Sequence, residues 1–185
     1  MIVWINGAFG AGKSTLAAGL HTALSQSVLA DPEDIGALLR QSMAGHYQQL
    51  RDYQDYPAWR RLTVHLITEL HQLAGGPVIV PMTVLNQAYA RDMFTPLSRL
   101  STAFHHLVLH ADPGPLTARI NTSLEYPGDG PRSEAVRSHR RRRTPDYEHA
   151  ATAWLHTVAH VIDTSTLTPG HTLQAALAHL FHTST

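Results

Sequence analysis

One octapeptide near the start of the chain constrains both local structure and chemistry. Residues 7–14 read Gly-Ala-Phe-Gly-Ala-Gly-Lys-Ser and match the whole pattern G-x-x-x-x-G-K-S. A β-branched and aromatic run at residues 2–5 precedes it, and a segment with one apolar helical face follows from Thr15. In a phosphate-binding loop, a strand leads into the loop and a helix follows it, and the backbone N–H groups of the loop and of the helix start surround the phosphates. The alternative is an ordinary glycine-rich turn.

Lys13 is the only lysine among the 14 Lys and Arg side chains of the chain. A compact ammonium group fits between phosphates better than a planar guanidinium does. We therefore predict that Lys13 reaches the β and γ phosphates of ATP and that the Ser14 hydroxyl ligates Mg²⁺. The predicted nucleotide-binding residues are Gly7, Ala8, Phe9, Gly10, Ala11, Gly12, Lys13, Ser14 and Thr15.

Length and composition limit the other possibilities. A chain of 185 residues with 43% apolar residues is typical of one globular domain with a core of its own. It contains no cysteine, which excludes disulfides and Cys-based metal sites. With no signal-peptide pattern and no apolar run of transmembrane length, we expect a cytoplasmic protein without stable membrane association. The zero net charge argues against sequence-independent nucleic-acid binding, and the oligomeric state stays open.

Strand and helix signals alternate along the chain, which predicts an α/β fold. The expected strands are residues 2–5, 27–30, 78–80, 104–110 and 158–162, and the main helices after the first are 31–44, 57–73, 86–100, 112–124 and 171–181. Continuous apolar strands joined by helices predict a five-stranded parallel sheet in a three-layer sandwich. Ligands of such sheets bind outside the carboxyl ends of the strands.

Three carboxylates follow predicted strands: Asp31, Asp112 and Asp163. Asp31 and Asp112 each precede a proline, which is also the pattern of a helix N-cap followed by Pro at the first helical position. For Asp112 we favour the cap. For Asp31 we favour a chemical role, because the second strand ends near the phosphate loop. Asp31 could accept a proton from a substrate hydroxyl or hold a water on Mg²⁺.

An arginine-rich segment follows a Gly/Pro loop at residues 126–131 and completes the predicted site. We interpret residues 125–145 as a lid whose guanidinium groups neutralise charge on a triphosphate. A solvated helix face is the simpler alternative. Nucleic-acid binding through residues 140–143 is a third, disfavoured because no aromatic residue interrupts the run.

The fourteen histidines do not form a metal-binding pattern. His105 and His106 are adjacent on a predicted strand and should face opposite sides of the sheet. We therefore expect the histidines to be core or surface residues, with Ser14 as the one predicted metal ligand.

Several segments together resemble the tunicamycin-resistance protein family. They are I-V-W-I-N-G-A-F-G-A-G-K at residues 2–13, Asp31-Pro32-Glu33 with Gly36 and Leu39-Arg40, Tyr56-Pro57-Ala58-Trp59-Arg60, Val80-Pro81-Met82-Thr83, His105-His106 and Arg119. The resemblance extends from residue 1 to about residue 180. It implies an ATP-binding P-loop protein with a fold similar to nucleoside and small-molecule kinases. It also implies resistance to a nucleoside antibiotic that blocks transfer of a sugar phosphate to a lipid carrier.

One departure from the family pattern affects the lid. Residues 120–123 read Ile-Asn-Thr-Ser where the family has further arginines after the one matched by Arg119. Any lid arginine must therefore come from a later position such as Arg137 or Arg141.

Motif and resemblance together predict one P-loop kinase-like domain, residues 1–185, that phosphorylates tunicamycin or a related uridine or amino-sugar nucleoside with MgATP. The predicted catalytic residues are Lys13, Asp31, Arg119 and Arg141. The predicted substrate pocket contains Arg40, Tyr56, Trp59, Arg60, Met82 and Thr83. The alternative is a nucleotide-dependent protein that sequesters the drug unmodified. A GTPase is disfavoured, because no second lysine exists for an Asn-Lys-x-Asp motif.

Overall fold

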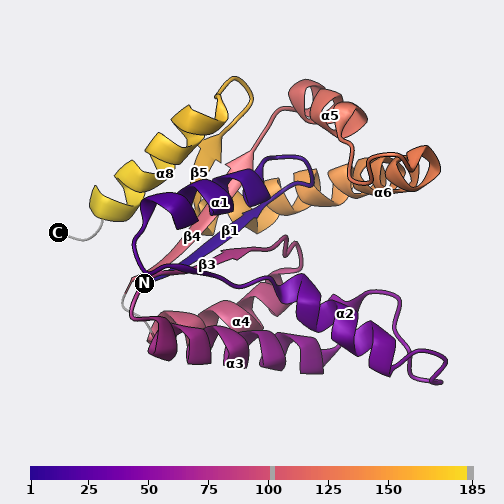
Figure 1. The fold of residues 1–185 in the computed structure, drawn as a ribbon, viewed down its shortest axis with the longest axis horizontal. Helices are drawn as coiled ribbons and strands as arrows, with labels where there is room; N and C mark the ends of the chain where they lie inside the picture. Colours follow the sequence, from indigo (N-terminus) through magenta and orange to yellow (C-terminus); the bar gives the residue numbers. More distant parts are fainter. Residues whose placement is uncertain (101–102, 183–185) are drawn as a thin grey trace.

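The computed structural model describes residues 1–100 and 103–182 and contains one five-stranded parallel sheet (Figure 1). The strands are β1 (Ile2–Gly7), β2 (Val28–Leu29), β3 (Val78–Pro81), β4 (Phe104–His110) and β5 (His160–Asp163), in the order β2-β3-β1-β4-β5. The α-helices are α1 (Lys13–Ala23), α2 (Pro32–Ser42), α3 (Pro57–Ala74), α4 (Gln87–Leu100), α5 (Pro113–Thr122), α6 (Gly130–Ala150), α7 (His156–Val158) and α8 (Pro169–His182). The predicted α/β class and parallel sheet are confirmed.

Helices cover both faces of this sheet (Figure 1). Helices α1 and α8 pack together on one face, and α3 and α4 pack together on the other. All six residues of β1 are buried because the strand lies in the middle of the sheet. The fully buried Trp4 on β1 contacts the Phe94 ring at 4.8 Å between centroids and donates its indole N–H to the Met82 carbonyl at 3.0 Å.

Two strand boundaries differ from the prediction. The edge strand β2 has two residues rather than four, because it pairs only with β3 and only over Val28–Leu29. The last strand begins at His160, later than expected. The chain before it stays helical, since α6 continues into a π-helical turn, Ala151–Leu155, and then into α7. The structure also contains a short 3₁₀-helix, Tyr53–Asp55, in the stretch with no predicted element.

A buried asparagine joins the end of β1 to the segment after β3. The Asn6 side-chain oxygen accepts hydrogen bonds from the N–H groups of Gly7 at 2.8 Å and Val84 at 3.1 Å, and its amide donates to the Val84 carbonyl at 2.9 Å. Alongside it, the Thr83 hydroxyl donates to the Gly7 carbonyl at 2.9 Å. Residues 82–84 are therefore held against the start of the phosphate loop, residues 7–14.

His106 predicts a pH dependence of folding. Its buried ring lies 3.5 Å from the Asn6 amide, and burial lowers the pKa of His106 to about 4. The unfolded chain binds this proton near pH 6.5, so the free energy of unfolding should fall as pH drops from about 6.5 to 4. The loss from this one group is about 3 kcal/mol.

Urea unfolding at a series of pH values checks this expectation. His106→Gln should flatten the slope over that range, whereas His65→Gln, at an exposed position on α3, should leave it unchanged. Equal slopes in the wild type and His106→Gln would show that His106 does not titrate in this way.

Candidate active site

The phosphate loop connects β1 to α1 through three glycines with positive φ: Gly7 at 139°, Gly10 at 85° and Gly12 at 100°. At Gly7 a Cβ atom would lie 2.4 Å from the Leu109 carbonyl oxygen, so the loop must leave the sheet at a glycine. Gly12 is the N-cap of α1, and no side chain caps the helix. The first N–H groups of α1 are therefore available to an anion, and the helix dipole favours one there.

The Lys13 ammonium group lies across this loop. It donates hydrogen bonds to the carbonyls of Gly7 at 3.2 Å and Ala8 at 2.8 Å. Burial lowers the pKa of Lys13 to about 8; Glu33 opposes this shift and Arg140 adds to it. A cation held in such surroundings gains from a nearby anion. Lys13, the α1 amides and the exposed Ser14 hydroxyl together fit MgATP. The ammonium group and the amides are hydrogen-bond donors for the phosphates, and the hydroxyl oxygen is a ligand for Mg²⁺.

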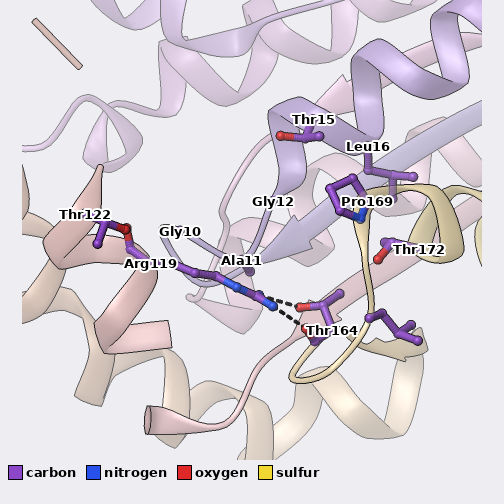
Figure 2. A pocket seen from close by; sticks show the side chains of 11 residues that line it. Gly10, Ala11, Gly12, Thr15, Leu16, Arg119, Thr122, Thr164, Pro169 and Thr172 are labelled. Carbon is purple, nitrogen blue, oxygen red and sulfur yellow. Dashed lines mark hydrogen bonds between the residues drawn. The ribbon is translucent and has the colours of Figure 1, made fainter. Parts of the chain in front are cut away.

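A cavity of about 440 Å³ lies on the α8 side of the loop (Figure 2). Its wall includes Thr15 on α1, Arg119 on α5 and Thr164 after β5. Arg119 crosses from α5 and donates to the Thr164 hydroxyl at 3.1 Å and to the Thr164 carbonyl. The predicted catalytic residue Arg119 is thus brought to the same cavity as the phosphate loop.

A second cavity, of about 830 Å³, lies on the other side of the loop; we call it the acceptor cavity. The loop contributes Phe9, the segment after β3 contributes Met82 and Thr83, and α2 contributes Arg40. Of the predicted substrate residues, Arg40, Met82 and Thr83 line this cavity. The rest of its wall comes largely from three places: residues 51–55, the start of α4 and the inner side of α6.

The other three predicted substrate residues lie behind this wall rather than in it. Trp59 is fully buried, and its indole N–H donates to the Pro32 carbonyl at 2.9 Å, so it is a core residue. The Tyr56 hydroxyl accepts from the Leu50 N–H at 2.6 Å. Arg60 pairs with Asp92 at 3.0 Å and donates to the Gln54 carbonyl at 2.6 Å. Arg60 therefore supports Gln54, which does line the cavity.

Asp31 is the N-cap of α2 and is exposed. Its carboxylate accepts a hydrogen bond from the Glu33 N–H at 2.9 Å. Glu33 is a charged neighbour of the loop that was not predicted. Burial and then Asp31 raise the pKa of Glu33, while Lys13, Arg40 and Arg140 lower it. Asp31 and Glu33 therefore lie together at the start of α2, and Glu33 is the one whose charge acts on Lys13. The predicted catalytic residue Asp31 is not among the residues that line either cavity. In the sequence, the only sign of a role for Glu33 was its position two residues after Asp31.

The two other candidate residues, Asp112 and Asp163, both form hydrogen bonds with Ser165. Asp112 occupies the predicted N-cap of α5, but its side chain forms no capping hydrogen bond, and its N–H donates to the Ser165 hydroxyl at 2.8 Å. The Asp163 carboxylate accepts from the Ser165 N–H at 2.8 Å and hydroxyl at 2.6 Å. These bonds fasten the loop after β5 to the start of α5.

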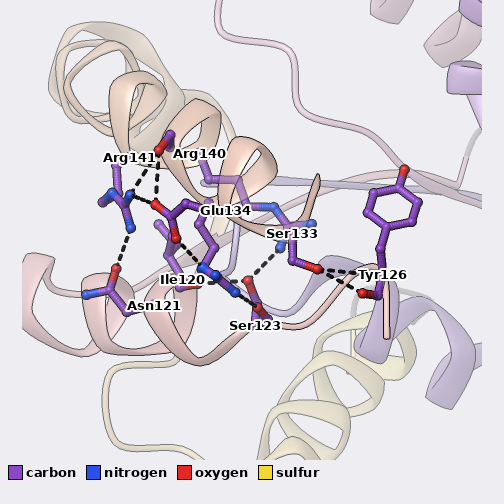
Figure 3. A network of polar contacts seen from close by, with 10 residues as sticks. Ile120, Asn121, Ser123, Tyr126, Ser133, Glu134, Arg140 and Arg141 are labelled. Carbon is purple, nitrogen blue, oxygen red and sulfur yellow. Dashed lines mark hydrogen bonds and ion pairs between the residues drawn. The ribbon is translucent and has the colours of Figure 1, made fainter. Parts of the chain in front are cut away.

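Helix α6 is attached to α5 by its arginines (Figure 3). Arg140 donates to the Ser123 hydroxyl at 3.2 Å and pairs with Glu125, and Arg141 donates to the Asn121 side chain at 2.7 Å and pairs with Glu134. The predicted catalytic residue Arg141 therefore binds groups of α5 and α6 in this conformation. Arg140 is the α6 arginine whose charge influences the pKa of Lys13.

Helix α6 also contacts the phosphate loop itself. The His139 ring packs against the Phe9 ring edge to face, with 5.7 Å between centroids.

Within residues 1–100 and 103–182, no three His, Cys, Asp or Glu side chains are grouped so that they could hold a metal ion. No helix in that part of the chain is long and apolar enough to cross a membrane.

Comparisons with known proteins agree with this architecture. The structure of the Deinococcus radiodurans tunicamycin resistance protein matches with a TM-score of 0.71 and 23% identity, over 97% of this chain and 94% of that chain. A sugar kinase from Janibacter sp. HTCC2649 matches with a TM-score of 0.59 and 15% identity, over 96% and 92%. A gluconokinase from Sinorhizobium meliloti 1021 matches with 0.57 and 15%, over 97% and 91%.

At the level of fold, these similarities confirm the resemblance inferred from the sequence. No curated protein sequence matches the chain. A family model described as an AAA domain matches residues 2–145, which include the phosphate loop, most of the sheet and the first part of α6. The chain therefore belongs to this AAA domain family and has a P-loop kinase-like fold.

Proposed function

We propose that the protein transfers the γ-phosphoryl group of ATP to a hydroxyl of tunicamycin or of a related uridine or amino-sugar nucleoside. The main support is that a phosphate loop separates two cavities, one next to Arg119 and the other next to Arg40 and Thr83. A kinase needs this arrangement, because nucleotide and acceptor approach the γ-phosphate from opposite sides. The fold similarity to a tunicamycin resistance protein supports the choice of acceptor.

In the proposed complex the nucleotide lies in the smaller cavity with its phosphates in the loop. Lys13 and the N–H groups at the start of α1 bind the phosphate oxygens, and Arg119, held by Thr164, lies beside them. Ser14 holds Mg²⁺, which when bound neutralises charge on the β and γ oxygens. The drug or nucleoside lies in the acceptor cavity against Arg40, Met82 and Thr83.

The transfer step balances without a further reactant. The acceptor hydroxyl oxygen attacks the γ-phosphorus, the bond to the β–γ bridging oxygen breaks, and ADP leaves. Asp31 accepts the hydroxyl proton. Arg119 stabilises the transferred group, and Arg141 joins it after α6 releases the bonds to Asn121 and Glu134.

Mass spectrometry of the drug tests this function. Protein, MgATP and tunicamycin are incubated, and the drug is weighed before and after. We expect a gain of one phosphoryl group that requires ATP. Tight binding with unchanged mass would contradict transfer and would support nucleotide-dependent sequestration.

Replacing Lys13 by alanine is expected to weaken MgATP binding by about tenfold to a hundredfold. The variant loses a charge-assisted hydrogen bond worth about 1.5–3 kcal/mol. Titration calorimetry measures the change. Lys13→Arg keeps the charge but has the wrong shape, so its affinity should lie between those of the wild type and Lys13→Ala. Wild-type affinity in Lys13→Ala would show that the nucleotide binds elsewhere.

A further inference from the structure

The acceptor cavity contains three carboxylates, and each already has a partner. Asp52 accepts from the Gln54 N–H at 3.0 Å, and Asp55 accepts from the Tyr89 hydroxyl at 3.0 Å. Asp146 pairs with Arg143 at 2.9 Å. All three carboxylates therefore have bonds within the protein, and Asp146 is the one that is ion-paired.

Three arginines also line this cavity and, unlike Asp146, have no ion-pair partner in the part of the chain that the structure describes: Arg40, Arg51 and Arg142. Among residues 1–100 and 103–182, none of the three forms an ion pair within 4.0 Å. The Arg40 guanidinium stacks over the Tyr53 ring, 4.8 Å from its centroid, and its charge also lowers the pKa of Glu33.

The arginines on the side of α6 that faces α5 are ion-paired, in contrast to Arg142. There Arg137 and Arg141 pair with Glu134, and Arg140 pairs with Glu125. Figure 3 shows the pair of Arg141 and Glu134. Two residues after Arg140 on the same helix, Arg142 faces the cavity without such a carboxylate. Unpaired guanidinium groups lining a cavity are suited to bind carboxylate or phosphate oxygens, often in pairs of parallel hydrogen bonds.

We propose that the acceptor for which this cavity is built is a hydroxylated, sugar-like molecule that also carries an anionic group, a carboxylate or a phosphate. The inference rests on the proposed phosphotransfer at the same site and goes beyond the acceptors proposed above, because an unmodified nucleoside carries no such anionic group. A volume of about 830 Å³ is enough for a molecule of nucleotide or disaccharide size. The hydroxyl end faces the phosphate loop near Thr83, and the anion lies among Arg40, Arg51 and Arg142.

The test compares neutral and anionic acceptors of the same skeleton: uridine with uridine 5′-monophosphate, and glucose with glucuronate. The protein is first saturated with MgADP, because a free phosphate group would otherwise bind the loop. Calorimetry then measures the affinity of each acceptor. We expect the anionic member of at least one pair to bind at least about tenfold tighter, as one charge-assisted hydrogen bond predicts.

Three variants locate the effect. Arg142→Gln and Arg51→Gln should each weaken binding of the anionic acceptor by about tenfold to a hundredfold and leave its neutral partner unchanged. Arg99→Gln is the matched control. It removes the same charge from an exposed position on α4 outside the cavity, and it should change neither affinity.

Each outcome decides the point. A preference confined to uridine 5′-monophosphate identifies a phosphate, and one confined to glucuronate identifies a carboxylate. No preference in either pair, no binding of any acceptor, or equal losses in Arg99→Gln and Arg142→Gln would overturn the inference. If MgADP itself does not bind, the proposed function fails as well. If MgADP binds and tunicamycin is phosphorylated without any preference for anions, only the substrate class is wrong.

Discussion

Replacing Asp31 by asparagine is expected to lower the turnover number for phosphoryl transfer by about 10²–10⁴-fold, with little change in MgATP affinity. The carboxylate of Asp31 caps α2 through the Glu33 N–H at 2.9 Å. Asparagine caps a helix as well as aspartate does but accepts no proton at neutral pH. The substitution therefore removes the chemical role and keeps the structural one, and steady-state kinetics with a thermal unfolding control separates them.

Two further variants make this result specific. Asp129→Asn makes the same change at the N-cap of α6, where the carboxylate accepts from the Arg132 N–H at 2.9 Å, and should leave turnover unchanged. Glu33→Gln tests the carboxylate next to Asp31. If Asp31→Asn keeps wild-type turnover, Asp31 is a helix cap only. A loss confined to Glu33→Gln would then assign proton transfer to Glu33.

Replacing Gly7 by alanine is expected to lower the free energy of unfolding by about 2–6 kcal/mol, the sum of backbone strain and overpacking. The φ angle of Gly7 is 139°, which side-chain-bearing residues rarely adopt. The new methyl group would also lie 2.4 Å from the Leu109 carbonyl oxygen, inside the sheet where backbone atoms cannot move apart cheaply. Urea denaturation of the variant measures the loss.

Gly128→Ala is the matched control for this prediction. Gly128 has a φ of 85°, but a Cβ atom there would have no neighbour within 4 Å. That variant should lose only the strain contribution, about 1–2 kcal/mol. If the two variants lose the same amount, the contact with Leu109 does not restrict this position.

The elements predicted from the sequence are those with strong local signals. Residues 2–5 are a continuous apolar run and residues 107–109 are a shorter one, and both lie in strands of the structure, β1 and β4. Pro57 after Tyr56 and Gly75 at the other end mark the helix that became α3. The phosphate loop was recognisable because its chemistry requires glycines and a lysine at fixed spacing.

The parts of the site that could not be predicted depend on which side of a helix faces the cavity. Trp59 was predicted to lie in the substrate pocket, but its position on α3 turns the indole toward Pro32 and the core. Arg140, Arg141 and Arg142 are consecutive in sequence, yet two bond toward α5 and the third lines the acceptor cavity. Such choices follow from the packing of α6 on α5 and on Phe9, which no local pattern encodes.

The central claim is that the Lys13 loop holds the phosphates of a magnesium-bound nucleotide. Calorimetric titration of the wild-type chain with MgATP tests it most directly. We expect saturable binding of one nucleotide per chain, weakened when Mg²⁺ is removed with a chelator. A titration that shows no binding of MgATP or of any other magnesium nucleotide would contradict the account.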